Sequence, residues 1–127
     1  MQLVRNLFQD IKFFKQNSLV ELAWLAESRI AEVKFRAEWI RFVREAEQCR
    51  PRLLLLDLSK LNYAFSDLTG PWCADNIRQI EEKGLEKAAL IAPAGESFEW
   101  LLEMVNEWNL ELRIFKDAEQ ARAWLNE

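Results

Sequence analysis

The sequence predicts a single α/β domain in which a mixed β-sheet with an N-terminal β-hairpin is flanked by about four helices. Short apolar or alternating runs, which are typical of strands, alternate with longer stretches of helical period. No linker, low-complexity tract or internal repeat interrupts the 127 residues, so we expect one domain over residues 1–127. Strands that alternate with helices favour parallel pairing through right-handed crossovers.

The N-terminal part of the chain predicts three strands. Leu3–Phe8 and Ile11–Lys15 are short β-prone runs, and Asn17-Ser18 is a plausible turn. In the third run, Leu19–Ala26, alternate side chains form one wholly apolar face, which we expect to meet the core: Val20, Leu22, Trp24 and Ala26. The second and third runs therefore predict a hairpin.

A helix and a buried strand follow. Over Ala31–Gln48 the apolar side chains recur at helical spacing, at Phe35, Trp39, Phe42 and Ala46, and Pro51 ends the helix. The predicted strand Arg52–Leu58 contains four consecutive leucines, Leu53 to Leu56. A continuous apolar run is typical of a strand that is covered on both faces of a sheet.

The second half repeats this alternation. Ser66 or Thr69 offers an N-cap for a helix that runs to Lys83, with Gly84 at its C-cap. The remaining elements are a strand at Lys87–Ala92, a helix at Phe98–Trp108, a strand at Leu110–Phe115 and a final helix capped by Asp117. The predicted order is βββ-α-β-α-β-α-β-α.

The composition excludes several chemistries. The chain has no histidine, which removes the commonest general base and the usual zinc ligand sets. Its three glycines form neither a dinucleotide fingerprint nor a phosphate-binding loop. Asp57 is more readily interpreted as a hydrogen-bonded strand-end carboxylate than as a catalytic acid, and Cys73 as a packed thiol. We therefore predict no enzyme activity, no catalytic residue, no metal and no cofactor.

Charge and cysteine content indicate the compartment and exclude some partners. A net charge of −4 argues against nucleic acid as a partner, and no apolar stretch is long enough to span a membrane. Cys49 and Cys73 have no motif spacing and are expected to be free thiols in a reducing cytosol. The prediction is a cytoplasmic protein.

The polar segment after the leucine strand is the best candidate for a functional surface. It lies at the carboxyl end of a central strand, where open α/β sheets place ligands and switches. Most tryptophans are expected in the core, with Trp72 as the exception nearest this segment. Candidates for an interaction or pocket surface are Tyr63, Phe65, Asp67, Thr69 and Trp72. Ser66 is also a candidate cap for the helix that follows this segment.

Two stretches of the chain resemble STAS domains of the SpoIIAA-like group, the anti-sigma-factor antagonists and their relatives. Asp57-Leu58-Ser59-Lys60-Leu61 is similar to the family's D/N-L-x-x-L after an apolar strand. The ending ELRIFKDAEQARAWL is similar to the closing strand and helix of the STAS/SEC14-like subgroup, through Asp117, Ala121, Trp124 and Leu125. The resemblance covers most of the chain.

This resemblance implies a mixed sheet of four or five strands and a role in protein–protein switching or, as in SEC14-like relatives, in holding an apolar ligand. Ser66 falls at the position of the family's phosphorylated serine, but Phe65 and Asp67-Leu68 do not reproduce the Asp-Ser-Ser-Gly motif. We therefore expect a non-catalytic, regulatory STAS-like protein-interaction domain that forms a homodimer and binds a protein partner. The alternative is a binding domain for a small apolar, lipid-like ligand.

Overall fold

The computed structural model describes residues 1–63, 66, 68–93, 95, 98–106 and 108–127. For Trp100 it describes the backbone but not the side chain. These residues form one six-stranded sheet with four helices. The elements are β1 (Gln2–Arg5), β2 (Gln9–Phe14), β3 (Leu19–Trp24), α1 (Glu32–Cys49), β4 (Leu53–Asp57), α2 (Thr69–Glu81), β5 (Lys87–Ile91), α3 (Glu99–Val105), β6 (Glu111–Phe115) and α4 (Ala118–Leu125).

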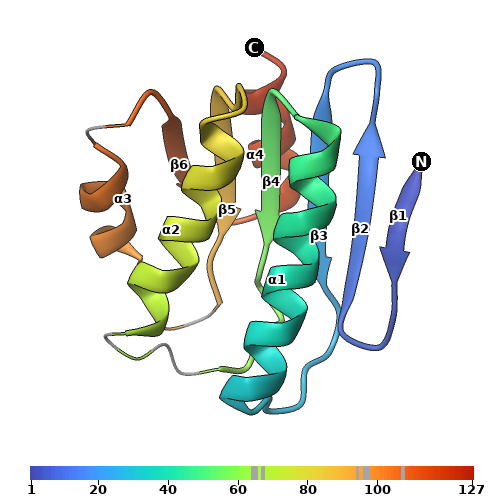
Figure 1. Cartoon of the computed structure of the whole chain (residues 1–127), viewed down its shortest axis with the longest axis vertical. Coiled ribbons are helices and arrows are strands. Elements are labelled where there is room, and N and C mark those ends of the chain that lie inside the picture. Colours follow the sequence, from blue (N-terminus) through green and yellow to red (C-terminus); the bar gives the residue numbers. More distant parts are fainter. Residues whose placement is uncertain (64–65, 67, 94, 96–97, 107) are drawn as a thin grey trace.

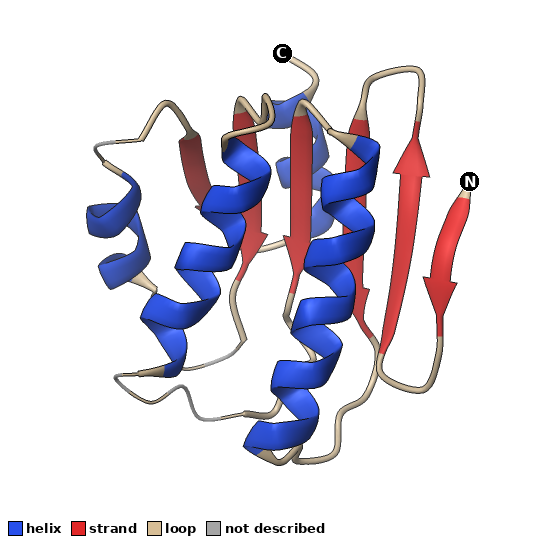
Figure 2. Ribbon diagram, in the orientation of Figure 1, coloured by secondary structure: helices blue, strands red, loops and turns tan. Residues whose placement is uncertain are grey.

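Each strand lies beside its neighbours in the sequence, in the order β1-β2-β3-β4-β5-β6 (Figure 1). The first three strands are antiparallel, and β3 to β6 are parallel. The crossovers all advance in the same direction, and α1, α2 and α3 lie on one face while α4 lies on the other (Figure 2). Because the strand order never reverses, the sheet has no topological switch point of the kind that forms a ligand crevice.

The predicted α/β class, the N-terminal hairpin and the order of elements are confirmed. The count of four or five strands implied by the family resemblance is wrong for this chain, because the sheet has six. The reason is that β1 pairs with β2, as in Arg5 with Asp10, and β3 pairs with β4, so the hairpin extends the parallel sheet instead of standing apart from it.

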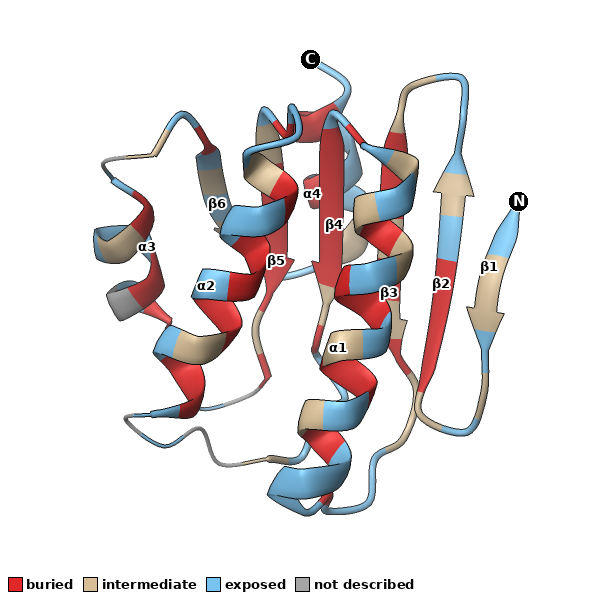
Figure 3. Ribbon diagram, viewed as in Figure 1, coloured by how far each residue is buried: buried red, intermediate tan, exposed pale blue. Residues whose placement is uncertain are grey.

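The leucine strand β4 is buried from both sides, as its continuous apolar run predicts (Figure 3). Leu54 and Leu56 belong to the main core beneath α1, α2 and α3. Leu53 and Leu55 lie on the opposite face in a second core that includes Trp124 of α4. Two layers of helices on one sheet therefore explain why this strand shows no alternation.

The helical stripe and its end also match the sequence. Phe35, Trp39, Phe42 and Ala46 are all buried on α1. The helix ends at Arg50, which adopts a left-handed conformation with φ 47° and ψ 56° before Pro51. The largest shifts in bounds are at β1, which ends at Arg5 instead of Phe8, and at α3, which spans Glu99–Val105 and is shorter than predicted.

Candidate functional site

The candidate site lies at the end of the molecule where the parallel strands finish. We define the carboxyl edge as residues 57–63, 66 and 68–72, which run from the last residue of β4 into the start of α2, together with the β1–β2 turn and the first turn of α1. In Figure 1 the start of α1, the start of α2 and the β1–β2 turn all lie at this lower end. Antiparallel pairing explains the position of the turn, because Gln9 at the start of β2 faces Trp24 at the end of β3.

Four side chains form a hydrogen-bonded group, the Thr69 cluster, made of Glu32, Tyr63, Ser66 and Thr69. The hydroxyl of Thr69, a fully buried residue, donates to Glu32 Oε1 over 2.8 Å. Since that uses its only proton, the Thr69 oxygen accepts from the Ser66 hydroxyl at 2.9 Å. Tyr63 Oη lies 3.1 Å from the same oxygen and 3.3 Å from Glu32 Oε1. These polar groups therefore satisfy one another.

Aromatic contacts hold the cluster against α1. The ring of Tyr63 stacks on Phe35 with 4.6 Å between centroids and 12° between planes. The guanidinium of Arg36 lies 4.7 Å from the ring centroid of Trp72, and its Nη2 is 3.4 Å from Glu32 Oε1. Trp72 is half-buried beneath this cation, so it supports the interface of α1 and α2 instead of opening onto a pocket.

Glu32 is held in its charged form. The hydrogen bond from Thr69 is the largest cause that lowers the pKa of Glu32 below its ordinary value. Desolvation opposes it, and the nearby Arg36 and Tyr63 lower the pKa further. An acceptor with a lowered pKa stays ionised at neutral pH. Glu32 is therefore an anchor for hydroxyl groups and is poorly suited to act as a general acid.

Ser66 has the geometry of a helix cap. Its Oγ accepts the backbone N–H of Thr69 at 3.2 Å, and its carbonyl accepts the N–H of Gly70 at 3.3 Å. These bonds satisfy donors at the start of α2 that have no partner within the helix. Ser66 therefore acts as a cap from two residues before Leu68, the N-cap position of α2, and its side chain remains exposed to solvent.

The structure brings Tyr63, Ser66, Thr69 and Trp72 together, whereas Phe65 and Asp67 lie outside the described residues. Sequence reasoning missed Glu32 and Arg36, which approach from α1. The sequence shows only that Glu32 is an acidic residue in the first turn of a predicted helix. This position does not predict which other segment its side chain contacts.

The two residues considered for catalysis are placed unfavourably. Asp57 Oδ1 accepts from the backbone N–H of Ser59 at 3.1 Å and from its hydroxyl at 2.7 Å, which makes it a strand-end turn residue. Burial raises the pKa of the Cys73 thiol to about 12, so it carries almost no thiolate at neutral pH. Among the described residues, no three Cys, Asp or Glu side chains are grouped to hold a metal ion.

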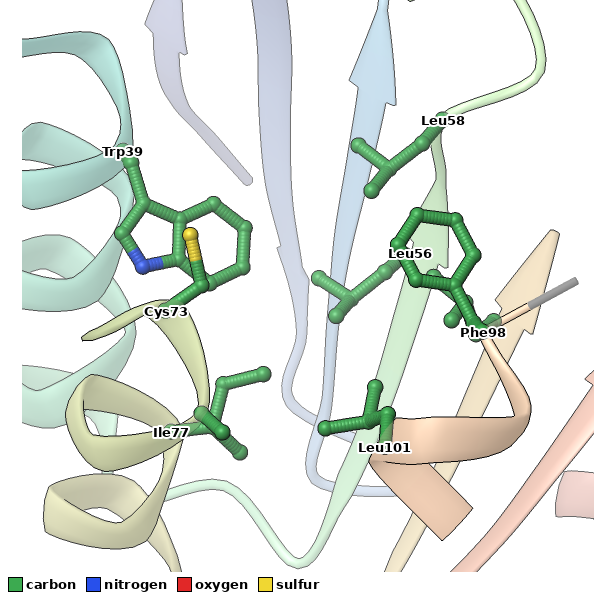
Figure 4. Close-up of a pocket in the computed structure, with 9 residues that line it drawn as sticks. Trp39, Leu56, Leu58, Cys73, Ile77, Phe98 and Leu101 are labelled. Carbon is green, nitrogen blue, oxygen red and sulfur yellow. The ribbon is translucent and has the colours of Figure 1, made fainter. Parts of the chain in front are cut away.

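A small apolar cavity lies between the helices and the sheet (Figure 4). Its volume is about 20 Å³, and it is lined by Trp39, Leu56, Leu58, Cys73, Ala74, Ile77, Leu90, Phe98 and Leu101. That is room for roughly one water molecule, whereas pockets for small ligands start at about 300 Å³. This cavity does not favour the apolar-ligand alternative.

Three large apolar side chains at the carboxyl edge are exposed to solvent. Leu7 in the β1–β2 turn is 84% exposed, Val33 in the first turn of α1 is 82% exposed, and Leu68 before α2 is 78% exposed. Each is a single exposed apolar side chain, and the three share the end of the molecule at which the parallel strands finish.

No helix in the described ranges combines the length and the apolar content needed to cross a membrane. Comparison of the chain with models of known families, with curated proteins and with solved structures found no match. The resemblance to STAS domains therefore stays a prediction that depends on the residues quoted above.

Proposed function

We propose that the chain is a non-catalytic STAS-like interaction domain that binds a partner protein through the carboxyl edge. The observation that carries this proposal is the exposure of Leu7, Val33 and Leu68 at one end of the molecule, at 84%, 82% and 78%. Covering apolar surface stabilises a complex by about 25 cal/mol per Å² before the costs of association. A partner with an apolar surface of its own is the chemistry that this edge fits.

The chemistry of the edge favours docking over catalysis. Glu32 is ionised and already accepts hydrogen bonds from Thr69 and Tyr63. Cys73 is a buried thiol whose pKa is raised to about 12, so it is a poor nucleophile. Groups that are hydrogen-bonded to one another stiffen a surface, which lowers the entropy lost on binding.

The residues that carry the family resemblance act in the fold. Leu58 and Leu61 of the Asp57–Leu61 stretch are each 4% exposed, and the N–H of Leu61 donates to the carbonyl of Leu58. They therefore build the turn after β4 that carries the carboxyl edge. A mixed sheet backed by helices is compatible with the resemblance.

The cysteines support a reducing compartment. Cys49 and Cys73 are both free, and free thiols are usual in the cytosol, where disulfides are rare. We therefore assign the proposed interaction to the cytoplasm. Fractionation of the native protein with its thiols blocked at lysis tests this assignment.

The proposed docking surface can be tested with charge placed on it. We would identify the protein captured by the tagged chain, purify it and titrate it against V33D and L68D variants by calorimetry. The matched control is Phe14→Asp, because Phe14 is 38% exposed at the other end of β2. We expect the control to bind like wild type and the two edge variants to bind at least about ten-fold more weakly.

Two outcomes would contradict the proposal. If V33D and L68D retain wild-type affinity while their melting temperatures are unchanged, the carboxyl edge is not the docking surface. If the wild-type chain captures no protein at all, the proposed function is wrong.

The apolar-ligand alternative has weaker support. The cavity between the helices and the sheet, at about 20 Å³, is too small for such a ligand. The larger hollows lie at the surface, such as the one of about 670 Å³ beside Met1, Phe13 and Phe14, and are open to solvent. Native mass spectrometry of the purified chain tests it directly. A co-purifying apolar molecule at one per chain would reverse the order of the two functions.

A further inference from the structure

The strand β6 ends the sheet on the side opposite β1. Within the described residues it pairs with β5 alone, in the register Lys87 with Glu111 through Ile91 with Phe115. The N–H of Glu111 donates to the carbonyl of Glu86 at 3.0 Å. In a parallel ladder this turns the backbone groups of Glu111, Arg113 and Phe115 towards β5, and those of Leu112 and Ile114 towards the open edge.

The two edge strands differ in how far they resist pairing with another strand. The register of β1 shifts between Gln2 and Val4, and the strand has four residues. Short, irregular edges of this kind are poor templates for further strands. The β5–β6 register is continuous over five residue pairs, so β6 presents a regular row of backbone donors and acceptors.

The charges on β6 suit pairing with an identical strand. Glu111 and Arg113 are both exposed, and strand alternation puts them on the same face as α4. The guanidinium of Arg113 lies 5.1 Å from the ring centroid of Trp124 on α4, which holds its charge on that face. Leu112 and Ile114 are half-buried and point to the other face, against the main core.

Charge selects one register for an antiparallel pair of β6 strands. In this register Leu112 lies opposite Leu112 of the second chain, and the outward N–H and C=O groups of the two Leu112 residues bond to each other. Glu111 of each chain then faces Arg113 of the other. These two pairs are of the closer, non-hydrogen-bonded type, in which side chains interact most. A two-fold axis at Glu111 or at Arg113 would instead place like charges opposite each other. An axis at Ile114 would set Arg113 opposite Phe115 and would form no Glu111–Arg113 pair.

We propose that β6 binds the β6 strand of a second copy of this chain in that antiparallel register, which gives a two-fold dimer with one continuous sheet. The proposal deepens the expected homodimer by naming its surface and its register. It uses a different side of the molecule from the carboxyl edge, and so it does not depend on the proposed docking surface.

A charge-swap series tests the register. We would measure the dimer dissociation constant by sedimentation velocity over a concentration series for wild type, Arg113→Glu, Glu111→Arg and the double variant E111R/R113E. Each single change makes both cross-strand pairs repulsive and should weaken the dimer by on the order of ten-fold or more. The double variant restores two opposite-charge pairs and should return the constant close to the wild-type value.

A matched control separates register from net charge. Arg44→Glu on the exposed side of α1 changes net charge as much as Arg113→Glu does, and it should leave the dimer unchanged. A wild-type chain that stays monomeric at high concentration, or a double variant that dimerises no better than the singles, would overturn the proposal. The V33D and L68D variants should dimerise normally, so failure of one proposal is distinguishable from failure of the other.

Discussion

Thr69 Oγ1 on α2 donates a 2.8 Å hydrogen bond to Glu32 Oε1 on α1, across 37 residues of sequence. This bond joins the first turns of two helices that pack side by side on one face of the sheet (Figure 1). It also fixes the positions of Ser66 and Tyr63, whose hydroxyl groups contact the same Thr69 oxygen. The Thr69 cluster is therefore one connected unit.

Replacing Thr69 with valine should lower the free energy of unfolding by about 1–2 kcal/mol, because it removes a buried hydroxyl and leaves its partners short of a hydrogen bond. Valine keeps the shape of threonine, so packing changes little. Urea denaturation of Thr69→Val measures this loss. Thr69→Ser keeps the hydroxyl and should lose less, and equal stability of all three proteins would show that the cluster does not stabilise the fold.

Stability should fall in acid through Glu32. Its pKa in the folded state is lowered from an ordinary value of 4.5, chiefly by the hydrogen bond from Thr69. A lowered folded pKa stabilises the protein above the unfolded value, and the contribution is lost as pH falls through the folded value. The stability difference between wild type and Glu32→Gln should thus be constant near neutral pH and shrink below 4.5.

The same comparison in a Thr69→Val background serves as the control for this pH effect. Without the hydrogen bond that lowers the pKa of Glu32, the acid-dependent part of the difference should become smaller. If the pH profile is identical in both backgrounds, the Thr69–Glu32 hydrogen bond is not the cause of the acid sensitivity.

At position 66, a neutral capping residue should stabilise the protein more than a negatively charged one. Ser66→Ala should cost about 1 kcal/mol of stability through loss of the bond to the Thr69 N–H. Ser66→Asn should recover most of it. Ser66→Asp can cap too, but its charge approaches the ionised Glu32 through Thr69, so we expect it to be less stable than the Asn variant in thermal melts at low salt.

The relative stability of the Asn and Asp variants also bears on phosphorylation of Ser66, because a phosphate would bring still more negative charge to the same place. An Asp variant at least as stable as the Asn variant would mean that the helix N-terminus and Arg36 outweigh Glu32. In that case the site would tolerate a phosphate.

Cys73 should resist thiol reagents in the folded state. Burial raises its pKa to about 12, and the residue is 7% exposed. A Cys49→Ser variant isolates this thiol, which should react with a disulfide reagent at neutral pH only after denaturation. Rapid reaction of the native variant would place Cys73 at an accessible surface and reopen the case for thiol chemistry.

Much of the fold follows from local pattern. The continuous run Leu53–Leu56 predicts burial on both faces, and the spacing of Phe35, Trp39 and Phe42 predicts the buried side of α1; both are confirmed. The alternation in Leu19–Trp24 likewise predicts that Val20, Leu22 and Trp24 are buried. These patterns are readable because each depends only on the period of one element.

The sequence by itself thus determined the fold class, the order of elements and the core faces. Only the tertiary structure decided that Glu32 and Arg36 complete the cluster around Thr69, that the cavity is about 20 Å³, and that β6 is left at the edge of the sheet. The reason is physical. Periodicity reports which side of an element faces the core, whereas the contacts of a polar side chain depend on how distant segments are brought together, and no local pattern records that.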